Sequence, residues 1–268
     1  MATPVSIPNP VMDRMRAGQP ALGMTVRLGH SGDIVRIAKA TGHDFVFIDV
    51  QHSLFNLETI GHMAQVALGC GIAAQVRVRS VDDPNVSVYL DNGVTGIVFP
   101  DVNNAQEAQR AVNAAKFAPI GKRSVCGGYP HFDYAAVPLT QSVPALNDAA
   151  LVVCMIETVE GLRNVEAIAA VPGVDVIHVG SNDLLVNMVK PGQFDDPEII
   201  AAQERAIAAA KAHGKFAGIG GNRDVQRQVK AIHKGCLYVT TQTDIGFLSA
   251  AANQWTRGVR EALGQTPA

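Results

Sequence analysis

The amino-acid sequence predicts an α/β fold, a (β/α)8 or TIM barrel with eight parallel strands. Short apolar runs alternate with helical patterns along the whole chain. Eight such strand–helix units fit within the 268 residues, in keeping with the roughly 250 residues of a typical barrel. An open, doubly wound sheet is the alternative, but no GxGxxG fingerprint follows the first apolar run. We therefore expect a single barrel domain over residues 1–268, with an N-terminal tail at about residues 1–18.

The strand predictions rest on short apolar runs that end at polar residues or glycines. A continuous apolar run of this length is typical of a strand that is buried on both faces. The runs FVFID and LVVCMIE are the clearest examples. In chain order, the predicted strands are residues 21–26, 45–49, 73–79, 96–100, 151–157, 174–180, 216–220 and 237–240.

The helix predictions rest on apolar residues that recur at three- and four-residue spacing, as the surface helices of a barrel require. Glycines follow several of these periodic segments and mark the helix ends, among them Gly42, Gly69, Gly93 and Gly235. In chain order, the predicted helices are residues 32–41, 57–69, 85–92, 105–115, 161–170, 197–213, 224–234 and 246–263.

Two long segments interrupt this alternation, at residues 116–147 and 185–195. They follow the fourth and the sixth predicted strand, and long loops in compact domains are usually functional. Because a barrel carries its active site at the C-terminal ends of its strands, we expect both segments to shape a substrate site there.

The composition favours a globular protein that acts on small molecules. Hydrophobic residues make up 47% of the chain and charged residues 17%, which favours a large core over disorder. The net charge of −2 gives no general attraction to nucleic acid or to an anionic membrane. We find neither a membrane-spanning apolar stretch nor a signal-peptide pattern. Four cysteines without CxxC spacing indicate free thiols in a reducing cytoplasm.

Two acidic residues that follow apolar strands are the candidate metal ligands, Glu157 and Asp183. A carboxylate at the end of a buried strand is unfavourable without a partner. Side by side at one barrel face, two carboxylates would form an oxygen-rich site for Mg²⁺ or Mn²⁺, with Co²⁺ also open. Each residue also has a structural alternative, since Glu157 could cap the helix near Gly161 and Asp183 could cap the helix that follows it. The two residues occupy matching positions near the ends of two predicted strands, and this favours metal binding over helix capping.

The segment that contains Asp183 is also a candidate substrate site. Ser181, Asn182 and Asp183 are expected to begin a helix, and the first backbone N–H groups of a helix have no partner within it. These groups can hold a substrate carboxylate next to the metal.

Charged residues at the end of the second strand and on the third strand are candidates for acid–base and anion-binding roles. His52 follows Asp49 by three residues, and a neutral histidine near a carboxylate is a suitable general base at pH 7. A solvent-facing loop histidine is the alternative. Arg77 and Arg79 share one face of the third strand and suit a substrate carboxylate or an enolate oxygen. One of the two could instead form a structural ion pair.

An ordered set of motifs resembles the HpcH/HpaI aldolases, a family of metal-dependent, class II aldolases of 2-oxo acids that is similar to the phosphoenolpyruvate/pyruvate-domain barrels. The segment FIDVQH at residues 47–52 is similar to the family's IDxEH. The resemblance covers roughly residues 20–260. The other matching segments are VRV at 76–78, LDNG at 90–93, FAPIGKR at 117–123, IET at 156–158 and GSNDL at 180–184.

The resemblance implies roles for individual residues. Glu157 and Asp183 would bind the divalent cation that chelates the keto oxygen and carboxylate of pyruvate. Arg77 would stabilise the enolate, and His52, oriented by Asp49, would act as the base. These roles amount to reversible cleavage of a 4-hydroxy-2-oxo acid into pyruvate, or a pyruvate-like 2-oxo acid, and an aldehyde.

The resemblance also implies assembly, and it has local departures. Asp91 in the LDNG turn would act across a subunit contact, in a homo-oligomer such as a hexamer built as a trimer of dimers, often by exchange of the last helix. The family's acidic residue before the histidine is Gln51 here, and its Gln before the metal glutamate is Met155. The match at strand three needs a shift of one residue, which leaves Arg79 as a second candidate for the enolate arginine.

Two alternative functions remain open from the sequence. A lyase for an acyl-CoA of the citramalyl-CoA type would need a basic strip for the nucleotide phosphates, for which Lys122 and Arg123 are candidates. A catalytically silent barrel that serves as a scaffold would not need the predicted cluster of charged residues. A class I aldolase is disfavoured because no lysine stands at a strand end, where a Schiff base would form.

Overall fold

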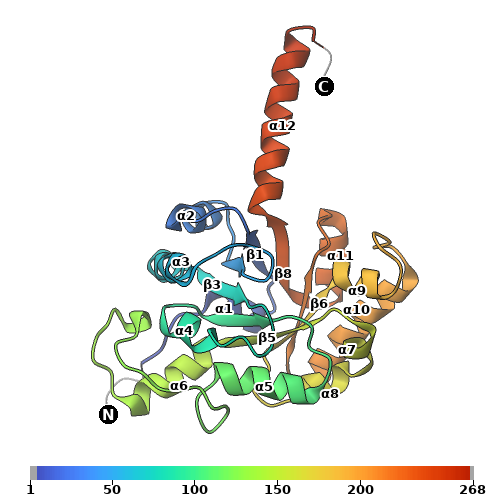
Figure 1. Ribbon diagram of the computed structural model, residues 1–268. Coiled ribbons are helices and arrows are strands. Elements are labelled where there is room, and N and C mark those ends of the chain that lie inside the picture. The colour runs from blue at the N-terminus through green and yellow to red at the C-terminus, as the bar shows by residue number, and fades with distance from the viewer. Residues whose placement is uncertain (1–4, 266–268) are drawn as a thin grey trace.

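The computed structural model, which describes residues 5–265, contains a closed barrel of eight parallel strands (Figure 1). Each strand pairs with the next in sequence, and β8 pairs with β1. This arrangement confirms the predicted (β/α)8 fold and excludes the open doubly wound sheet. The strands are β1 (Ala21–Val26), β2 (Phe45–Asp49), β3 (Ala73–Arg77), β4 (Gly96–Phe99), β5 (Leu151–Ile156), β6 (Val176–Gly180), β7 (Phe216–Gly220) and β8 (Cys236–Thr243).

The helices lie around the outside of the barrel (Figure 1). They follow the predicted order, although the segment predicted as one helix at 161–170 forms two short helices that meet at Asn164. The helices are α1 (Pro10–Arg16), α2 (Gly32–Ala40), α3 (Leu57–Cys70), α4 (Val86–Asp91), α5 (Ala105–Ala115), the 3-10 helix η1 (Pro130–Phe132), α6 (Leu139–Ala149), α7 (Val159–Arg163), α8 (Val165–Ala169), α9 (Ser181–Asn187), α10 (Pro197–Ala212), α11 (Val225–Lys234) and α12 (Asp244–Ala262).

Local sequence signals account for the ends of these helices. In α3, the side chain of Asn56 accepts a hydrogen bond of 2.7 Å from the amide of Thr59, and this satisfies a group that the first turn leaves free. The helix stops where Gly71 adopts a φ of 68°, a conformation that glycine reaches without strain. The core lies between the outer helices and the strands, and every residue of β2 and β5 is buried.

The helix α1 closes the N-terminal end of the barrel, in a region that the sequence predicts as a tail. Val11, Met12 and Met15 are buried in one cluster with the inward-facing Phe45 and Tyr238. Burial of such side chains is favourable by about 1.5–3 kcal/mol each. Residues 10–16 are therefore part of the barrel core, while residues 1–4 lie outside the described part of the chain.

Two departures from the predicted bounds affect the interpretation of the site. Strand β3 ends at Arg77, so Arg79 lies in the following loop and does not share a strand face with Arg77. Helix α12 stands away from the barrel instead of packing along it (Figure 1). Asp244, the first residue of α12, is its buried residue, and the other positions are largely exposed. No helix within residues 5–265 is both long and apolar enough to cross a bilayer.

Candidate active site

A cavity of about 230 Å³ opens at the C-terminal ends of the strands, the face at which barrel enzymes place their active sites. Most of the predicted charged residues gather there, together with several that the sequence did not single out. The walls are formed by Thr25, Arg27, Phe47, Asp49, His52, Arg77, Met155, Glu157, His178, Gly180, Asn182, Asp183, Gly220, Gly221, Arg223, Thr240 and Thr243.

Glu157 and Asp183 line the same cavity, just after the C-terminal ends of two adjacent strands. Glu157 directly follows β5, is 3% exposed, and accepts a hydrogen bond of 3.1 Å from the backbone amide of Asp101. Asp183 lies in the first turn of α9, which begins where β6 ends. A Cβ atom on Gly180 would overlap the carboxylate of Glu157, so the glycine leaves the space that this side chain occupies.

The electrostatic surroundings of Glu157 fit a bound cation. Burial raises the pKa of its carboxyl to about 8, against the lowering effects of Arg77 and the Asp101 amide, and Asp183 and Asp101 raise it further. A nearby divalent cation would stabilise the ionised form of both carboxylates. Within residues 5–265 no group of three His, Cys, Asp or Glu side chains is placed to hold a metal. Mg²⁺ commonly takes one or two carboxylates and fills its other positions with water and substrate oxygens, so this pair of residues suits it.

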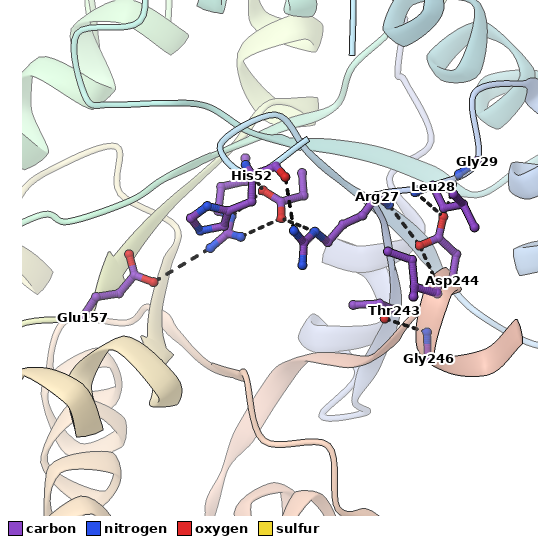
Figure 2. A network of polar contacts seen from close by, with 11 residues as sticks. Arg27, Leu28, Gly29, His52, Glu157, Thr243, Asp244 and Gly246 are labelled. Carbon is purple, nitrogen blue, oxygen red and sulfur yellow. Dashed lines mark hydrogen bonds and ion pairs between the residues drawn. The ribbon is translucent and has the colours of Figure 1, made fainter. Parts of the chain in front are cut away.

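Asp49 and Arg77 form a bidentate pair at the edge of the cavity. The Nε and Nη2 atoms of Arg77 donate to the two carboxylate oxygens at 3.0 and 2.8 Å. Asp49 is 1% exposed, and the Nε atom of Arg27 lies 3.5 Å from its Oδ2 atom. The Nη1 atom of Arg77 lies 4.0 Å from Glu157, so this guanidinium spans the space between the two acidic residues. Figure 2 shows this network.

His52 lies in the same network through its backbone (Figure 2). Its amide donates to Asp49 at 3.3 Å, and its carbonyl accepts from Arg27 at 3.2 Å. The contact between Asp49 and His52 thus runs through the peptide and not through the ring, unlike the contact that the resemblance implies. The imidazole itself lines the cavity.

Three predicted site residues lie outside the cavity lining. The backbone amide of Arg79 donates to Asp83, and its Nε atom reaches the carbonyl of Val50 at 3.4 Å. Asp91, at the end of α4, accepts a hydrogen bond of 2.6 Å from Arg123. Ser181 is fully buried, and its hydroxyl has no hydrogen-bond partner within residues 5–265, whereas its neighbours Asn182 and Asp183 line the cavity.

His178, an inward-facing residue of β6, forms part of the cavity wall. It is 1% exposed and stands edge-on to Tyr238, with ring centroids 5.2 Å apart. Burial, with smaller effects of Arg77 and Arg223, lowers the pKa of its imidazole to about 3, so the ring is neutral. A Cβ atom on Gly220 would lie 2.6 Å from its Nε2 atom. The glycines of the neighbouring strand β7 are the sequence signal for this arrangement. Because they carry no side chain, they leave space for a bulky inward-facing residue on β6.

Arg27 and Arg223 are the main cavity residues that the sequence analysis missed. Each lies after a strand, Arg27 after β1 and Arg223 after β7. Their position at strand ends was the available signal, but neither belongs to a motif that the resemblance supplied.

Comparison with known proteins agrees with this arrangement. A sequence profile described as HpcH/HpaI aldolase/citrate lyase matches residues 25–250. A 4-hydroxy-4-methyl-2-oxoglutarate aldolase of Chaetomium globosum is 36% identical over 250 residues, which are 91% of this chain and 92% of that protein. A pyruvate aldolase of Rhizobium etli is 33% identical over 88% of this chain and 91% of its own length.

A solved structure of an aldolase with the same family name has the same fold. The crystal structure of an HpcH/HpaI aldolase from Desulfitobacterium hafniense DCB-2 superposes with a TM-score of 0.89 at 28% identity, covering 93% of this chain and 96% of that one. The profile match, the aldolase relatives and the shared barrel all indicate a carbon–carbon lyase. The chain therefore belongs to the HpcH/HpaI aldolase/citrate lyase family and is an aldolase.

Proposed function

We propose that this enzyme reversibly cleaves a 4-hydroxy-2-oxo acid into pyruvate, or a pyruvate-like 2-oxo acid, and an aldehyde, and that it requires a divalent metal. The observation that carries the metal requirement is the pair Glu157 and Asp183, two carboxylates that follow adjacent strands and line one cavity. The aldolase names of the relatives support the reaction, and the name of the Rhizobium relative supports pyruvate as a product.

Glu157 and Asp183 would hold Mg²⁺, Mn²⁺ or Co²⁺. When bound, such a cation acts as a Lewis acid that polarises the keto oxygen of the 2-oxo acid. The protein prepares for it by fixing Glu157 through the Asp101 amide and by leaving room for the carboxylate at Gly180. Asn182 and Asp183 lie in the first turn of α9, where free backbone N–H groups can orient the substrate carboxylate.

Bond cleavage needs a base and a stabilised enolate. His52 is the candidate that accepts the proton of the 4-hydroxyl group as the bond between C3 and C4 breaks. The electron pair of that bond passes to C3 and C2 and forms the pyruvate enolate, while C4 becomes the carbonyl carbon of the second product. Arg77 can stabilise the enolate oxygen because Asp49 fixes its guanidinium at the cavity edge. In the synthetic direction the same base removes a methyl proton of pyruvate.

Two observations bear on the alternative functions. Arg123, one of the two basic residues available to hold CoA phosphates, has a side chain that is 1% exposed and pairs with Asp91. It is therefore not free to form a phosphate-binding strip. The assembly of charged residues around one cavity is difficult to reconcile with a silent scaffold, because such a cluster is unfavourable unless a ligand uses it.

The decisive experiment is a metal-supplemented cleavage screen over 4-hydroxy-2-oxo acids, with pyruvate release as the readout. We expect release with Mg²⁺, Mn²⁺ or Co²⁺ and loss of activity with EDTA. Borohydride in the presence of pyruvate should leave the protein unmodified, because no Schiff base forms. Full activity after rigorous chelation, or covalent trapping by borohydride, would contradict the proposal.

The enzyme is also proposed to form a homo-oligomer, such as a hexamer built as a trimer of dimers. Helix α12 extends from the barrel with exposed Leu248, Trp255 and Val259, an apolar surface that a second copy could cover. Asp91 lies outside the cavity of its own chain, which is compatible with a role at the cavity of a neighbour.

The substrates and products of the proposed reaction are small molecules. The four cysteines form no disulfides, which supports a cytoplasmic location for the enzyme.

A further inference from the structure

The cavity has two chemically different sides. Its carboxylates, those of Asp49, Glu157 and Asp183, belong to β2, β5 and the start of α9 after β6. The side built from β7, β8, β1 and their loops contributes no carboxylate to the described lining. It includes Arg27, Gly220, Gly221, Arg223, Thr240 and Thr243. Guanidinium and hydroxyl donors without a carboxylate among them are suited to bind an oxyanion.

Arg223 is the cation on this side that lacks a partner. Within residues 5–265 no carboxylate forms an ion pair with its guanidinium, whereas Arg27 lies 3.5 Å from Asp49. Arg223 lies at the rim of the cavity, where part of the residue contacts solvent. The protein around it nonetheless lowers its pKa to about 10, first by removing water from the guanidinium and then through Arg77 and Arg27, with Asp49 opposing them. A bound anion would relieve this repulsion.

The loop that carries Arg223 is held in place on both sides. Gly221 adopts a φ of 81°, a left-handed backbone conformation that favours glycine. Asn222 is buried, and its carbonyl accepts a hydrogen bond of 2.7 Å from the side chain of Gln228. Asp224 then caps α11. Arg223 thus stands between fixed residues, so little backbone order is lost when it binds a ligand.

Arg27 is fixed from the other side of β8. The backbone amides of Arg27, Leu28 and Gly29 donate to the carboxylate of Asp244 at 3.1, 2.8 and 2.8 Å (Figure 2). The two arginines therefore flank one strand, on firmly held backbone, across the barrel mouth from Glu157.

We propose that Arg223, with Arg27 beside it, binds a second carboxylate of the substrate, attached to C4. A 4-hydroxy-2-oxo acid with a carboxylate on C4 is the substrate in the name of the Chaetomium relative, and the new step is the assignment of the two arginines that would select such a substrate here. The second product of cleavage is then itself a 2-oxo acid, such as glyoxylate. This inference rests on the proposed aldolase function and names the residues that determine its substrate specificity. The size of the cavity agrees with it, since about 230 Å³ suits a small diacid and falls below the roughly 300–1,000 Å³ of pockets for drug-sized ligands.

The test uses two substrates that differ only at the proposed contact. 4-Hydroxy-2-oxoglutarate carries a carboxylate on C4, and 4-hydroxy-2-oxopentanoate carries a methyl group there. We expect the wild-type enzyme with Mg²⁺ to prefer the diacid in kcat/KM. Arg223→Ala should lower the ratio of the two kcat/KM values about 10- to 100-fold, the usual effect of losing a hydrogen bond to a charged group. Arg223→Lys should lower it less, because it keeps the charge but loses the guanidinium fork.

The matched control is Arg36→Ala, an exposed arginine of α2 that lies outside the cavity lining, and it should keep the wild-type ratio. A wild-type enzyme that cleaves both substrates equally well would overturn the second-carboxylate site while leaving the aldolase function intact. An unchanged ratio in Arg223→Ala would have the same meaning. Cleavage of neither substrate would count against the aldolase function itself.

A binding measurement decides the inference independently of catalysis. 2-Oxoglutarate and 2-oxopentanoate lack the 4-hydroxyl group and cannot be cleaved, yet they differ by the same carboxylate. In calorimetric titrations with Mg²⁺, the diacid should bind more tightly to the wild-type enzyme, and Arg223→Ala should remove the difference. Equal binding of the two acids to the wild type, or tighter binding of inorganic phosphate than of 2-oxoglutarate, would overturn the assignment.

Discussion

Asp49 holds Arg77 through two parallel hydrogen bonds, one to each carboxylate oxygen, at 3.0 and 2.8 Å. The carboxylate is 1% exposed and also lies near Arg27, so one buried anion balances two guanidinium groups. The pair fixes the Arg77 guanidinium that faces Glu157. A change at Asp49 would therefore affect both the stability of the barrel mouth and the catalytic role of Arg77.

Asp49→Asn should therefore destabilise the protein and impair catalysis. The substitution leaves two partly buried guanidiniums without their counter-ion, and breaking such a pair lowers the free energy of unfolding by about 3–5 kcal/mol. Urea denaturation at pH 7 measures this. The matched control is Asp82→Asn, which breaks an exposed pair with Arg110 and should change the free energy of unfolding by less than about 1 kcal/mol. Equal losses in the two variants would show that the buried pair has no special role.

Glu157→Gln should abolish tight binding of the divalent cation. Loss of even an outer partner of a metal site typically lowers affinity about 10- to 100-fold, and a direct ligand should cost at least as much. Titration with Mn²⁺ followed by calorimetry measures the affinity. Glu160→Gln, a change at an exposed residue of α7, is the control and should bind like the wild type.

Cation binding should also depend on pH. Because the pKa of the Glu157 carboxyl is raised to about 8, this group holds a proton at pH 7 when no cation is present. A cation must displace that proton, so the affinity should rise as the pH increases toward 8 and level off above it. The pH dependence should disappear in Glu157→Gln. A wild-type affinity that stays constant from pH 6 to pH 8 would contradict this account.

The fold could be predicted from the sequence because its strands are continuous apolar runs of the right number. The prediction was weaker where local pattern and tertiary packing differ. Residues 10–16 have no strong periodicity, and their helix is recognisable only from the barrel floor against which Val11 and Met15 pack. Likewise, nothing in the apolar pattern of residues 73–79 shows that β3 stops at Arg77.

Gly220→Ala should destabilise the barrel. Its Cβ atom would lie 2.6 Å from the Nε2 atom of His178 and 2.7 Å from the hydroxyl oxygen of Thr240, and such overpacking lowers the free energy of unfolding by about 1–3 kcal/mol. The control is Gly69→Ala in helix α3, where a Cβ atom meets nothing within 4 Å. That change should raise the free energy of unfolding by roughly 0.5–1 kcal/mol. Thermal denaturation distinguishes the opposite signs.

His131 should make the protein acid-sensitive in a defined window. Burial lowers the pKa of its ring to about 4, with the Val94 carbonyl opposing this and Arg123 adding to it. Between pH 6.5 and 4 the unfolded chain takes up a proton that the folded chain refuses, so stability is fully present above pH 6.5 and falls as the pH decreases through this range. The slope from one such group is at most about 1.4 kcal/mol per pH unit.

The variant His131→Gln should flatten this part of the stability profile. Urea denaturation from pH 7 to pH 4 provides the measurement. His213→Gln, which changes an exposed histidine at the end of α10, is the control and should retain the wild-type slope. A profile that is the same in all three proteins would assign the acid sensitivity to other groups.

Helix α12 provides the prediction for assembly. Trp255→Asp places a charge on the apolar surface that a second copy would cover and should shift the molar mass measured by light scattering toward that of the monomer. Asn253→Asp lies on the opposite side of the same helix, two positions away, and is the control. A wild-type protein that is monomeric at micromolar concentration would contradict the proposed oligomer.

The site was predictable to the extent that its residues stand in ordered motifs at strand ends. Glu157, Asp183, Arg77, His52 and Asp49 all line the cavity. The sequence could not show that Asp49 engages the Arg77 side chain and only the peptide of His52, because that choice depends on side-chain directions at the barrel mouth. Arg223 was missed because its importance comes from what surrounds it and not from a motif.

The seam between β1 and β8 has a consequence for how the chain folds. It joins Ala21 to Tyr238, and the carboxylate of Asp244 then ties down the amides of residues 27–29, a link across more than 200 positions. Contacts so distant in sequence form late and slow the search for the native state. Until the last strand arrives, both flanking strands present unpaired edges that invite aggregation. The anchoring carboxylate therefore belongs to the final step of ring closure, and the same step sets Arg27 in place.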